Sequence, residues 1–462
     1  MHPFVERVYF NSPLFVQNAM ISLYGYKLYR ERYAGNYKRY LRELLKSQWH
    51  TEAEMRLLVE HKFKSIITHA FESVPYFMGL AKRGTIKPQS IKSILDLDRF
   101  PILSKEQIRN DPESFLSRAI PKSHLLTIST SGTTGTPLKI FVDKNSRRLA
   151  YAFFGRLKNW AGISDRLPSV TFGGRTILPP YACEPPFWRR NLTMNNFLFS
   201  SYHMSPATMG YYVEKLLEIK PHFIDAYPSS IFTLATYLKE NNISGIFPKA
   251  IITSSETLLH HQRELIQEVF RCPVFDQYGC AEQVVFASQC EEGTYHLHPE
   301  FCIVEFLRED GTKALPGEPS RLICTGFTNR AMPLIRYDIG DTAILSDKRC
   351  PCGRNFPVLE MILGRVDDLI VTPDGRWIGR LDPIFKGLRS VREAQIVQKD
   401  YTTICVRIVP HENFSKKEAD VITWEMKKRI GIGARVEIEV VENIPRSSGG
   451  KFRAVVSNIS KP

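Results

Sequence analysis

Apolar residues recur three and four positions apart through much of the first 125 residues, which is the spacing of one face of a helix. The segment 52–74, EAEMRLLVEHKFKSIITHAFESV, carries this pattern along its whole length. The pattern predicts a mostly helical lead-in over residues 1–125.

Between residue 125 and about residue 362, short β-rich runs alternate with helical segments such as 210–219. This alternation is typical of α/β layering around a parallel sheet. The Pro-rich piece 178–186 predicts an irregular loop. The expected strands are 124–130, 138–142, 223–227, 250–254, 272–278, 301–307 and 321–325.

The pattern changes after Gly364, where short strands at 394–398, 403–409 and 435–441 flank one helix at 416–430. A chain of 462 residues also exceeds the size at which one hydrophobic core stops growing. We therefore predict an α/β protein with two domains. The large N-terminal domain, with layered α/β sheets, spans residues 1–363, and a small α+β domain spans residues 364–462.

Composition adds little, because 43% hydrophobic and 24% charged residues are ordinary for a globular protein. Glu6 and Arg7 interrupt the N-terminal apolar stretch and no cleavage pattern follows, so we expect no signal peptide. No apolar run of about 18 residues predicts a transmembrane helix. The nine scattered cysteines, an odd number, indicate a reducing compartment, and we expect a cytoplasmic protein.

The net charge of +14 suits a polyanionic partner such as ATP, CoA, acidic lipid or nucleic acid. The densest basic run lies between Lys27 and Lys46, where Arg, Lys and Tyr mix with apolar residues at helical spacing. Two interpretations stay open for this run. It is either a solvated amphipathic helix or a patch that contacts a membrane surface or nucleic acid.

The most informative segment is 130–139, TSGTTGTPLK, which lies between two expected strands. Its glycines allow backbone to approach a ligand closely, and its hydroxyl and N–H groups supply donors for a polyphosphate. It lacks the ending of a Walker loop, and a polar hairpin tip is the alternative. The candidate phosphate ligands are Ser131, Gly132, Thr133, Thr134 and Gly135.

This loop resembles the phosphate-binding motif of the adenylate-forming superfamily of acyl-CoA synthetases, peptide-synthetase adenylation domains and luciferases. Four further segments resemble that family's motifs in the right order. They are 276–282 (DQYGCAE), 336–341 (RYDIGD), 364–368 (GRVDD) and 444–451 (IPRSSGGK). The segments 172–175 and 226–230 look most like the phenylacetate-CoA ligase group, especially its branch associated with capsular polysaccharides.

The resemblance implies a role for each matched residue. Tyr278 and Gly279 would contact adenine, Asp341 would bind the ribose, and Glu282 with Thr134 would hold Mg²⁺. Lys451 and Arg365 would act at the reacting phosphate, while Asp367 would be the hinge about which a mobile C-terminal domain rotates. Ser254, Ser255 and Glu256 follow an expected strand and occupy the family's adenine-contacting loop.

The resemblance implies activation of an aryl or acyl carboxylic acid with ATP and Mg²⁺ as an acyl-AMP, followed by acyl transfer. Segment 372–387 departs from the family's thioester-forming pattern, so the acceptor stays open among CoA, a carrier-protein pantetheine, and an amine or hydroxyl of a glycan. A non-catalytic basic protein or nucleic-acid binder is a further alternative. The joint presence of Glu282, Asp341 and Lys451 argues against it.

Cysteine spacing predicts a structural zinc site. Cys350 and Cys352 form a tight Cys-x-Cys-Gly turn, while Cys290 and His296 offer a second pair, and three thiolates with one imidazole suit tetrahedral Zn²⁺. His298 rivals His296, but the family's spacing favours His296. The alternative is a set of reduced cysteines without a metal.

The other six cysteines are expected to be small core residues. They are Cys183, Cys272, Cys280, Cys302, Cys324 and Cys405. Segment 198–206 lies where the family's acyl pocket begins, so His203 and Tyr202 are candidates to face the acid. A structural role is the alternative for His203.

Overall fold

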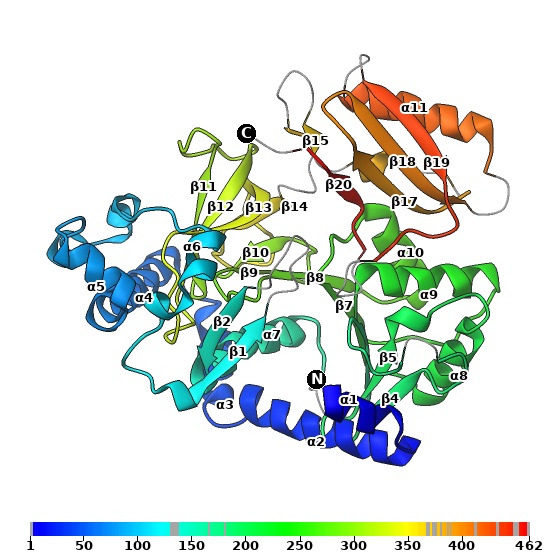
Figure 1. Ribbon diagram of the computed structural model, residues 1–462, viewed down its shortest axis with the longest axis horizontal. Helices are drawn as coiled ribbons and strands as arrows, with labels where there is room; N and C mark the ends of the chain where they lie inside the picture. Colours follow the sequence, from blue (N-terminus) through cyan, green and yellow to red (C-terminus); the bar gives the residue numbers. More distant parts are fainter. Residues whose placement is uncertain are drawn as a thin grey trace.

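The computed structural model describes most of the chain (Figure 1). The described residues are 3–129, 138–164, 167–179, 182–365, 370–371, 377–378, 381–385, 388, 390–410, 414–430, 434–446 and 452–459.

Helices form the lead-in and cover the sheets, and several begin at a side-chain cap. Thr51 and Glu54 form a capping box at the start of α4, while Asp143 accepts backbone N–H bonds at the start of α7. The helices are α1 (Pro3–Phe10), α2 (Leu14–Arg32), α3 (Tyr37–Ser47), α4 (Glu52–Ser73), α5 (Pro75–Lys82), α6 (Lys105–Asn110), α7 (Lys144–Trp160), α8 (Met209–Ile219), α9 (Pro228–Glu240), α10 (His260–Phe270) and α11 (Lys416–Ile430).

Two groups of strands lie in the large domain. A two-stranded ribbon joins β1 (Leu125–Ser129) to β2 (Lys139–Asp143). The large sheet contains β3 (Ser169–Gly173), β4 (Trp188–Asn191), β5 (Asn196–Ser200), β6 (Phe223–Ala226), β7 (Ala250–Ser254), β8 (Val274–Gly279), β9 (Phe286–Gln289), β10 (Tyr295–Leu297), β11 (Cys302–Leu307), β12 (Pro319–Gly326), β13 (Tyr337–Ser346) and β14 (Val358–Arg365).

The large sheet has the strand order β11-β12-β13-β14-β10-β9-β8-β7-β6-β3-β5-β4. Strands β8, β7, β6, β3 and β5 pair in parallel, whereas the pairs from β8 to β11 and the pair β4–β5 are antiparallel. The parallel strands are buried and strongly apolar, as in the AIIT run of β7. The expected parallel centre of the fold is therefore confirmed.

The C-terminal part has its own sheet and its own core, and Figure 1 shows it above the large domain. Its strands are β15 (Ile370–Val371), β16 (Trp377–Ile378), β17 (Val391–Gln398), β18 (Thr403–Pro410), β19 (Arg435–Val440) and β20 (Val455–Ser457). Strands β19-β18-β17-β20 form one sheet, against which α11 buries Ile422, Met426 and Ile430. The predicted α/β fold class, with a smaller C-terminal domain, is confirmed.

The exact domain boundary stays a prediction. Strand β14 runs to Arg365, two residues past the predicted end of the large domain at 363, and the sheet of the small domain begins at Val391.

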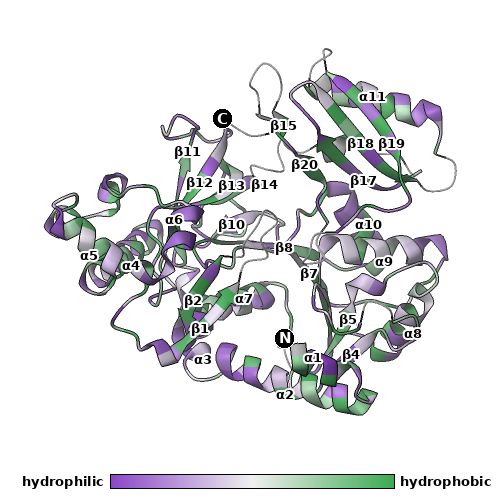
Figure 2. Ribbon diagram, in the orientation of Figure 1, coloured by the Kyte–Doolittle hydropathy of each residue, from purple (hydrophilic) through white to green (hydrophobic). Residues whose placement is uncertain are grey.

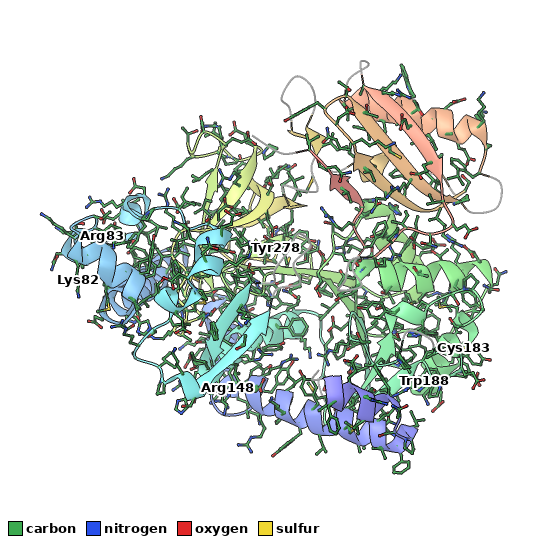
Figure 3. The ribbon with its side chains drawn as sticks, in the orientation of Figure 1. Lys82, Arg83, Arg148, Cys183, Trp188 and Tyr278 are labelled. Atoms are coloured by element: carbon green, nitrogen blue, oxygen red, sulfur yellow. The ribbon has the colours of Figure 1, made fainter. Side chains whose placement is uncertain are left out.

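Two sequence-based interpretations need correction. The basic run 27–46 is not one helix, because α2 and α3 are separated by a turn in which Gly35 has φ +59°, a conformation open to glycine. Cys183 is exposed and lies at the periphery in Figure 3, and Cys280 is only partly buried, so neither is a core residue. Cys272, Cys302, Cys324 and Cys405 are buried.

No helix in the described part of the chain is both long and apolar enough to cross a membrane.

Candidate active site and metal centre

A cavity of about 2440 Å³ lies where the large sheet meets the C-terminal domain. Typical ligand pockets measure roughly 300–1,000 Å³, so this one has room for more than one small molecule. Its walls include the ends of β7 and β8, the middle of β13, the end of β14 and the residues around Phe452. Figure 3 shows Tyr278 in the centre of the molecule, close to this junction.

Tyr278 and Asp341 meet in this cavity although 63 residues separate them in sequence. The Tyr278 hydroxyl donates to Oδ2 of Asp341 over 2.6 Å. Burial, followed by the nearby Asp341 charge, raises the pKa of Tyr278 well above its usual value, so the phenol stays protonated and keeps donating. Asp341 also pairs across the sheet with Arg365 of β14. The structure thus brings together the predicted adenine and ribose segments.

Glu282 lies at the base of the same cavity and is 3% exposed. Its Oε1 accepts a hydrogen bond from the Tyr337 hydroxyl at 3.1 Å and lies 3.7 Å from Nζ of Lys105. Among the described residues only Oε1 is engaged in this way. The second carboxylate oxygen, Oε2, is a hard anionic metal ligand. Mg²⁺ prefers such oxygen ligands and is usually bound by one or two carboxylates.

Glu256 connects the two domains. Its Oε1 accepts from the backbone N–H of Phe452 at 2.6 Å, and its carboxylate also accepts from the N–H and hydroxyl of Ser229 at 3.0 and 3.1 Å. Burial raises the pKa of Glu256, whereas the hydrogen bonds from Phe452 and Ser229 lower it. Phe452 follows Lys451 in the sequence, so the segment predicted to deliver the catalytic lysine reaches the large domain at this point.

Three of the seven described non-glycine residues with positive φ lie near these residues. Ser255 (φ +73°), Gln283 (φ +57°) and Arg336 (φ +56°) all occupy the left-handed region, which non-glycine residues rarely adopt. Each sits within or next to a predicted nucleotide segment. Such conformations cost about 1–3 kcal/mol apiece and persist where the surrounding structure over-determines them, as at functional sites.

Several predicted site residues fall outside the described residues. They are Ser131, Gly132, Thr133, Thr134, Gly135, Asp367 and Lys451, and the same holds for the side chain of Arg365. Gly279 and Ser254 line the cavity.

Cys290, His296, Cys350 and Cys352 come together, with all their ligand atoms within 4.8 Å of one another. Sγ of Cys290 lies 3.6 Å from Sγ of Cys350, and Sγ of Cys352 lies 3.3 Å from Nε2 of His296. Two turns supply the cysteines. In each turn the carbonyl of the first cysteine accepts from the N–H of a left-handed glycine, Gly293 or Gly353.

The donor set fits a structural zinc ion. Burial raises the pKa of the Cys290 thiol to about 12, so its thiolate form needs a nearby cation. Burial, together with Arg354, lowers the pKa of His296 to about 4, which leaves the neutral imidazole that a metal requires. All four donors belong to the protein, so the site would have no open position for substrate.

His298 is committed elsewhere. Its Nδ1 lies at 2.5 Å from the Arg156 guanidinium and its Nε2 at 2.8 Å from the Ser288 hydroxyl. Arg156 also forms a fully buried ion pair with Glu300 at 2.7 Å and donates to the Leu44 carbonyl. This network fastens α3 and α7 to the sheet beside the cysteine cluster, which leaves His296 as the imidazole of the cluster.

A further part of the cavity lies between α2, α7 and the parallel strands, and sequence reasoning missed it. Asp225 of β6 lines it together with Lys158 and Arg175. Burial raises the pKa of Asp225, while Lys158, Arg175 and Arg32 counteract this effect. No local sequence signal marks Asp225, because it reads as an ordinary polar position in a strand. Lys105 was missed for the same reason, since it reads as the first residue of a capped helix.

His203 and Tyr202 do not line this cavity. Nδ1 of His203 lies 2.7 Å from the Ser200 hydroxyl and Nε2 lies 3.1 Å from the Pro179 carbonyl, so both ring nitrogens are engaged. The Tyr202 hydroxyl donates to the Gly174 carbonyl. The structural alternative is therefore the better account of His203.

Comparison with known proteins agrees with this geometry. Protein CapK of Staphylococcus aureus is 26% identical over 459 residues, covering 98% of this chain and 99% of CapK. Phenylacetate-coenzyme A ligase of Thermus thermophilus is 23% identical, covering 87% of this chain and 96% of that protein. The family model described as the CapK C-terminal domain matches residues 370–458.

The fold is similar to that of 2-hydroxyisobutyryl-CoA ligase. In its postadenylation state with 2-HIB-AMP, that enzyme gives a TM-score of 0.70 at 18% identity, covering 89% of this chain and 92% of that one. In its thioesterification state the TM-score falls to 0.57. The arrangement of the two domains here therefore resembles the postadenylation arrangement.

Motifs, fold and relatives agree: over most of its length the chain is similar to CapK and to phenylacetate-coenzyme A ligase, and its fold is similar to that of a CoA ligase. The resemblance to the phenylacetate-CoA ligase group, and to CapK within it, is therefore supported by the relatives and by the family model over residues 370–458.

Proposed function

We propose that this protein uses ATP and Mg²⁺ to activate a carboxylic acid as an acyl-AMP and then transfers the acyl group to the thiol of CoA or of a carrier-protein pantetheine. The observation that carries this proposal is the hydrogen bond from the Phe452 N–H to Glu256. Phe452, the residue after Lys451, lines the cavity together with Tyr278, Asp341 and Glu282, and this supports the proposal.

In the first half-reaction a carboxylate oxygen of the acid attacks the α-phosphorus of ATP, and the bond to pyrophosphate breaks. Negative charge grows on the phosphate oxygens, so preorganised donors and cations lower the barrier. Asp341, oriented by Tyr278, would hold the ribose hydroxyls. Ser131 to Gly135 would bind the β- and γ-phosphates, and Lys451 with Arg365 would stabilise the charge at the α-phosphate.

Glu282, with Thr134, would bind Mg²⁺, which supplies positive charge to the phosphates when bound. Tyr337 and Lys105 both contact Oε1 of Glu282, and among the described residues this leaves Oε2 for the cation.

In the second half-reaction the thiol attacks the acyl carbonyl and AMP leaves. The Phe452 to Glu256 bond must break if the C-terminal domain rotates about Asp367 to admit the acceptor. Formation and release of this contact would exclude water from the acyl-AMP and then open the site.

We further propose that Cys290, His296, Cys350 and Cys352 hold a structural Zn²⁺. The cluster lies next to the active site along β10, because Tyr295 donates a hydrogen bond to Asp276 of β8, two residues before Tyr278.

Pyrophosphate release from ATP tests the function across a panel of aryl, fatty, hydroxy and amino acids, each with and without CoA. Release that depends on one acid supports adenylation, and faster turnover with CoA supports the thiol acceptor. Acid-dependent release that CoA and pantetheine leave unchanged would favour amide or ester transfer to a glycan or amine. Absence of release with every acid would contradict the proposal.

Lys451→Ala is expected to slow acyl-AMP formation by at least about a hundredfold, since one stabiliser of transition-state charge is lost. ATP binding, measured by isothermal titration calorimetry, should stay near that of the wild type. The exposed Lys220→Ala serves as a control. An adenylation rate equal to that of the wild type would remove Lys451 from the mechanism.

A further inference from the structure

Helix α2 turns Gln17, Asn18 and Ser22 toward the large sheet and leaves several large apolar side chains exposed. Gln17 accepts a hydrogen bond from Nε of Arg189 at 2.6 Å, Asn18 from the N–H of Arg190 at 2.9 Å, and Ser22 from the N–H of Leu192 at 3.0 Å. These contacts run along β4, the last strand of the large sheet.

The opposite face of α2 is apolar and uncovered. Phe15, Leu23 and Tyr26 are 74%, 71% and 52% exposed, and with Ala19 they follow the four- and three-residue spacing of one helical face. Helix α1 adds Phe4 and Val8, which are 71% and 43% exposed. We call Phe4, Val8, Phe15, Leu23 and Tyr26 the apolar stripe.

The part of the chain that carries the apolar stripe is rich in exposed hydrophobic side chains. Of the 23 large hydrophobic side chains that are exposed among the described residues, nine lie between Phe4 and Tyr29. Contiguous exposed apolar surface usually marks an interaction site. Figure 2 shows hydrophobic segments on α1 and α2 at the lower edge of the molecule.

Charge identifies the kind of partner. Residues 1–49 contain eight lysines and arginines but three glutamates. Lys27 and Arg30 are exposed near the C-terminal end of the stripe, and Lys38, Arg39 and Lys46 are exposed on α3, the next helix along this edge in Figure 1. Exposed aromatic and aliphatic residues beside a basic cluster are the features of a helix that lies in the interface of an anionic bilayer.

We propose that the protein binds the surface of anionic lipid membranes through the apolar stripe, with the basic residues of α2 and α3 on lipid headgroups. The hydrogen bonds of α2 to β4 are on the other face and remain intact during binding. The C-terminal domain, which lines one end of the cavity, lies at the opposite edge of the molecule from α1 and α2 in Figure 1, so a bound molecule keeps that end of the cavity accessible. This inference does not depend on the proposed reaction.

Flotation of the full-length protein with phosphatidylcholine vesicles, with and without phosphatidylglycerol, tests the proposal. We expect binding to the vesicles that contain phosphatidylglycerol to be at least about tenfold greater, because several cations approach the headgroups, and to weaken as salt is raised. Absence of binding to anionic vesicles at low salt would overturn the proposal.

Two double variants separate the contribution of the apolar stripe from that of the basic residues. Phe15→Ser with Leu23→Ser should lower the bound fraction at least tenfold, and Lys27→Glu with Arg30→Glu should remove the preference for anionic lipid. Leu57→Ser with Leu315→Ser is the control, because these leucines are 72% and 62% exposed at other places and should leave binding unchanged. Circular dichroism and thermal denaturation verify that each variant is folded.

Size-exclusion chromatography addresses the rival occupant, a second copy of the chain. The membrane proposal would be overturned by two results together. The wild type would be a dimer that the Phe15→Ser, Leu23→Ser variant no longer forms, and this variant would still bind vesicles. A monomeric wild type that floats with anionic vesicles, and a variant that does not, would support it.

Discussion

Replacement of Glu282 by glutamine is expected to lower acid-dependent pyrophosphate release by at least about a hundredfold, because the cavity loses the buried charge that would anchor Mg²⁺. The substitution keeps the shape of the side chain. An amide oxygen can still accept from Tyr337, so the fold should be retained. Pyrophosphate release at saturating ATP, measured over a range of Mg²⁺ concentrations, provides the readout.

A matched control is Glu360→Gln, which removes a carboxylate from an exposed position on β14 along the same cavity. Its rate should stay close to that of the wild type. A Glu282→Gln enzyme with an unchanged rate and an unchanged Mg²⁺ dependence would show that the metal is held elsewhere.

The second large effect concerns the cysteine cluster. Cys350→Ser with Cys352→Ser is expected to reduce bound zinc from about one ion per chain to nearly none, and to lower the melting temperature by about 5 °C or more. The reason is that two of four ligands are removed from a site whose binding free energy contributes to folding. Elemental analysis of the purified protein and thermal denaturation provide the two measurements.

Cys183→Ser is the matched control, since Cys183 is exposed and lies far from the four proposed ligands in the sequence. It should keep both the zinc content and the melting temperature. A wild-type protein without zinc after purification in zinc-containing medium would end the proposal.

Many of the candidate site residues can be predicted from short sequence motifs. Tyr278, Glu282 and Asp341 lie in short motifs that resemble those of the adenylate-forming superfamily, and the fold brings their segments to one cavity. The cysteine cluster was likewise predictable, because each turn pairs ligands close in sequence and needs a glycine at a fixed place.

Other features depend on packing between distant segments and have no local signal. Lys105 reaches Glu282 from a lead-in helix, and Asp225 lines the cavity only because the parallel strands lie in a particular order. The orientation of α2 is a similar case. Phe15, Ala19, Leu23 and Tyr26 follow one helical face, but only the position of β4 shows that Gln17 and Asn18 lie on the inner side of the helix.

The cover that α2 gives to β4 also guards against self-association. Strand β4 ends the large sheet, and an uncovered edge strand offers its N–H and C=O groups to strands of other molecules. Asn18 and Ser22 occupy the N–H groups of Arg190 and Leu192. A chain that began after Arg32 would lose this cover together with the apolar stripe. Such a truncation would remove the exposed apolar surface but would expose the edge of β4 to strands of other molecules.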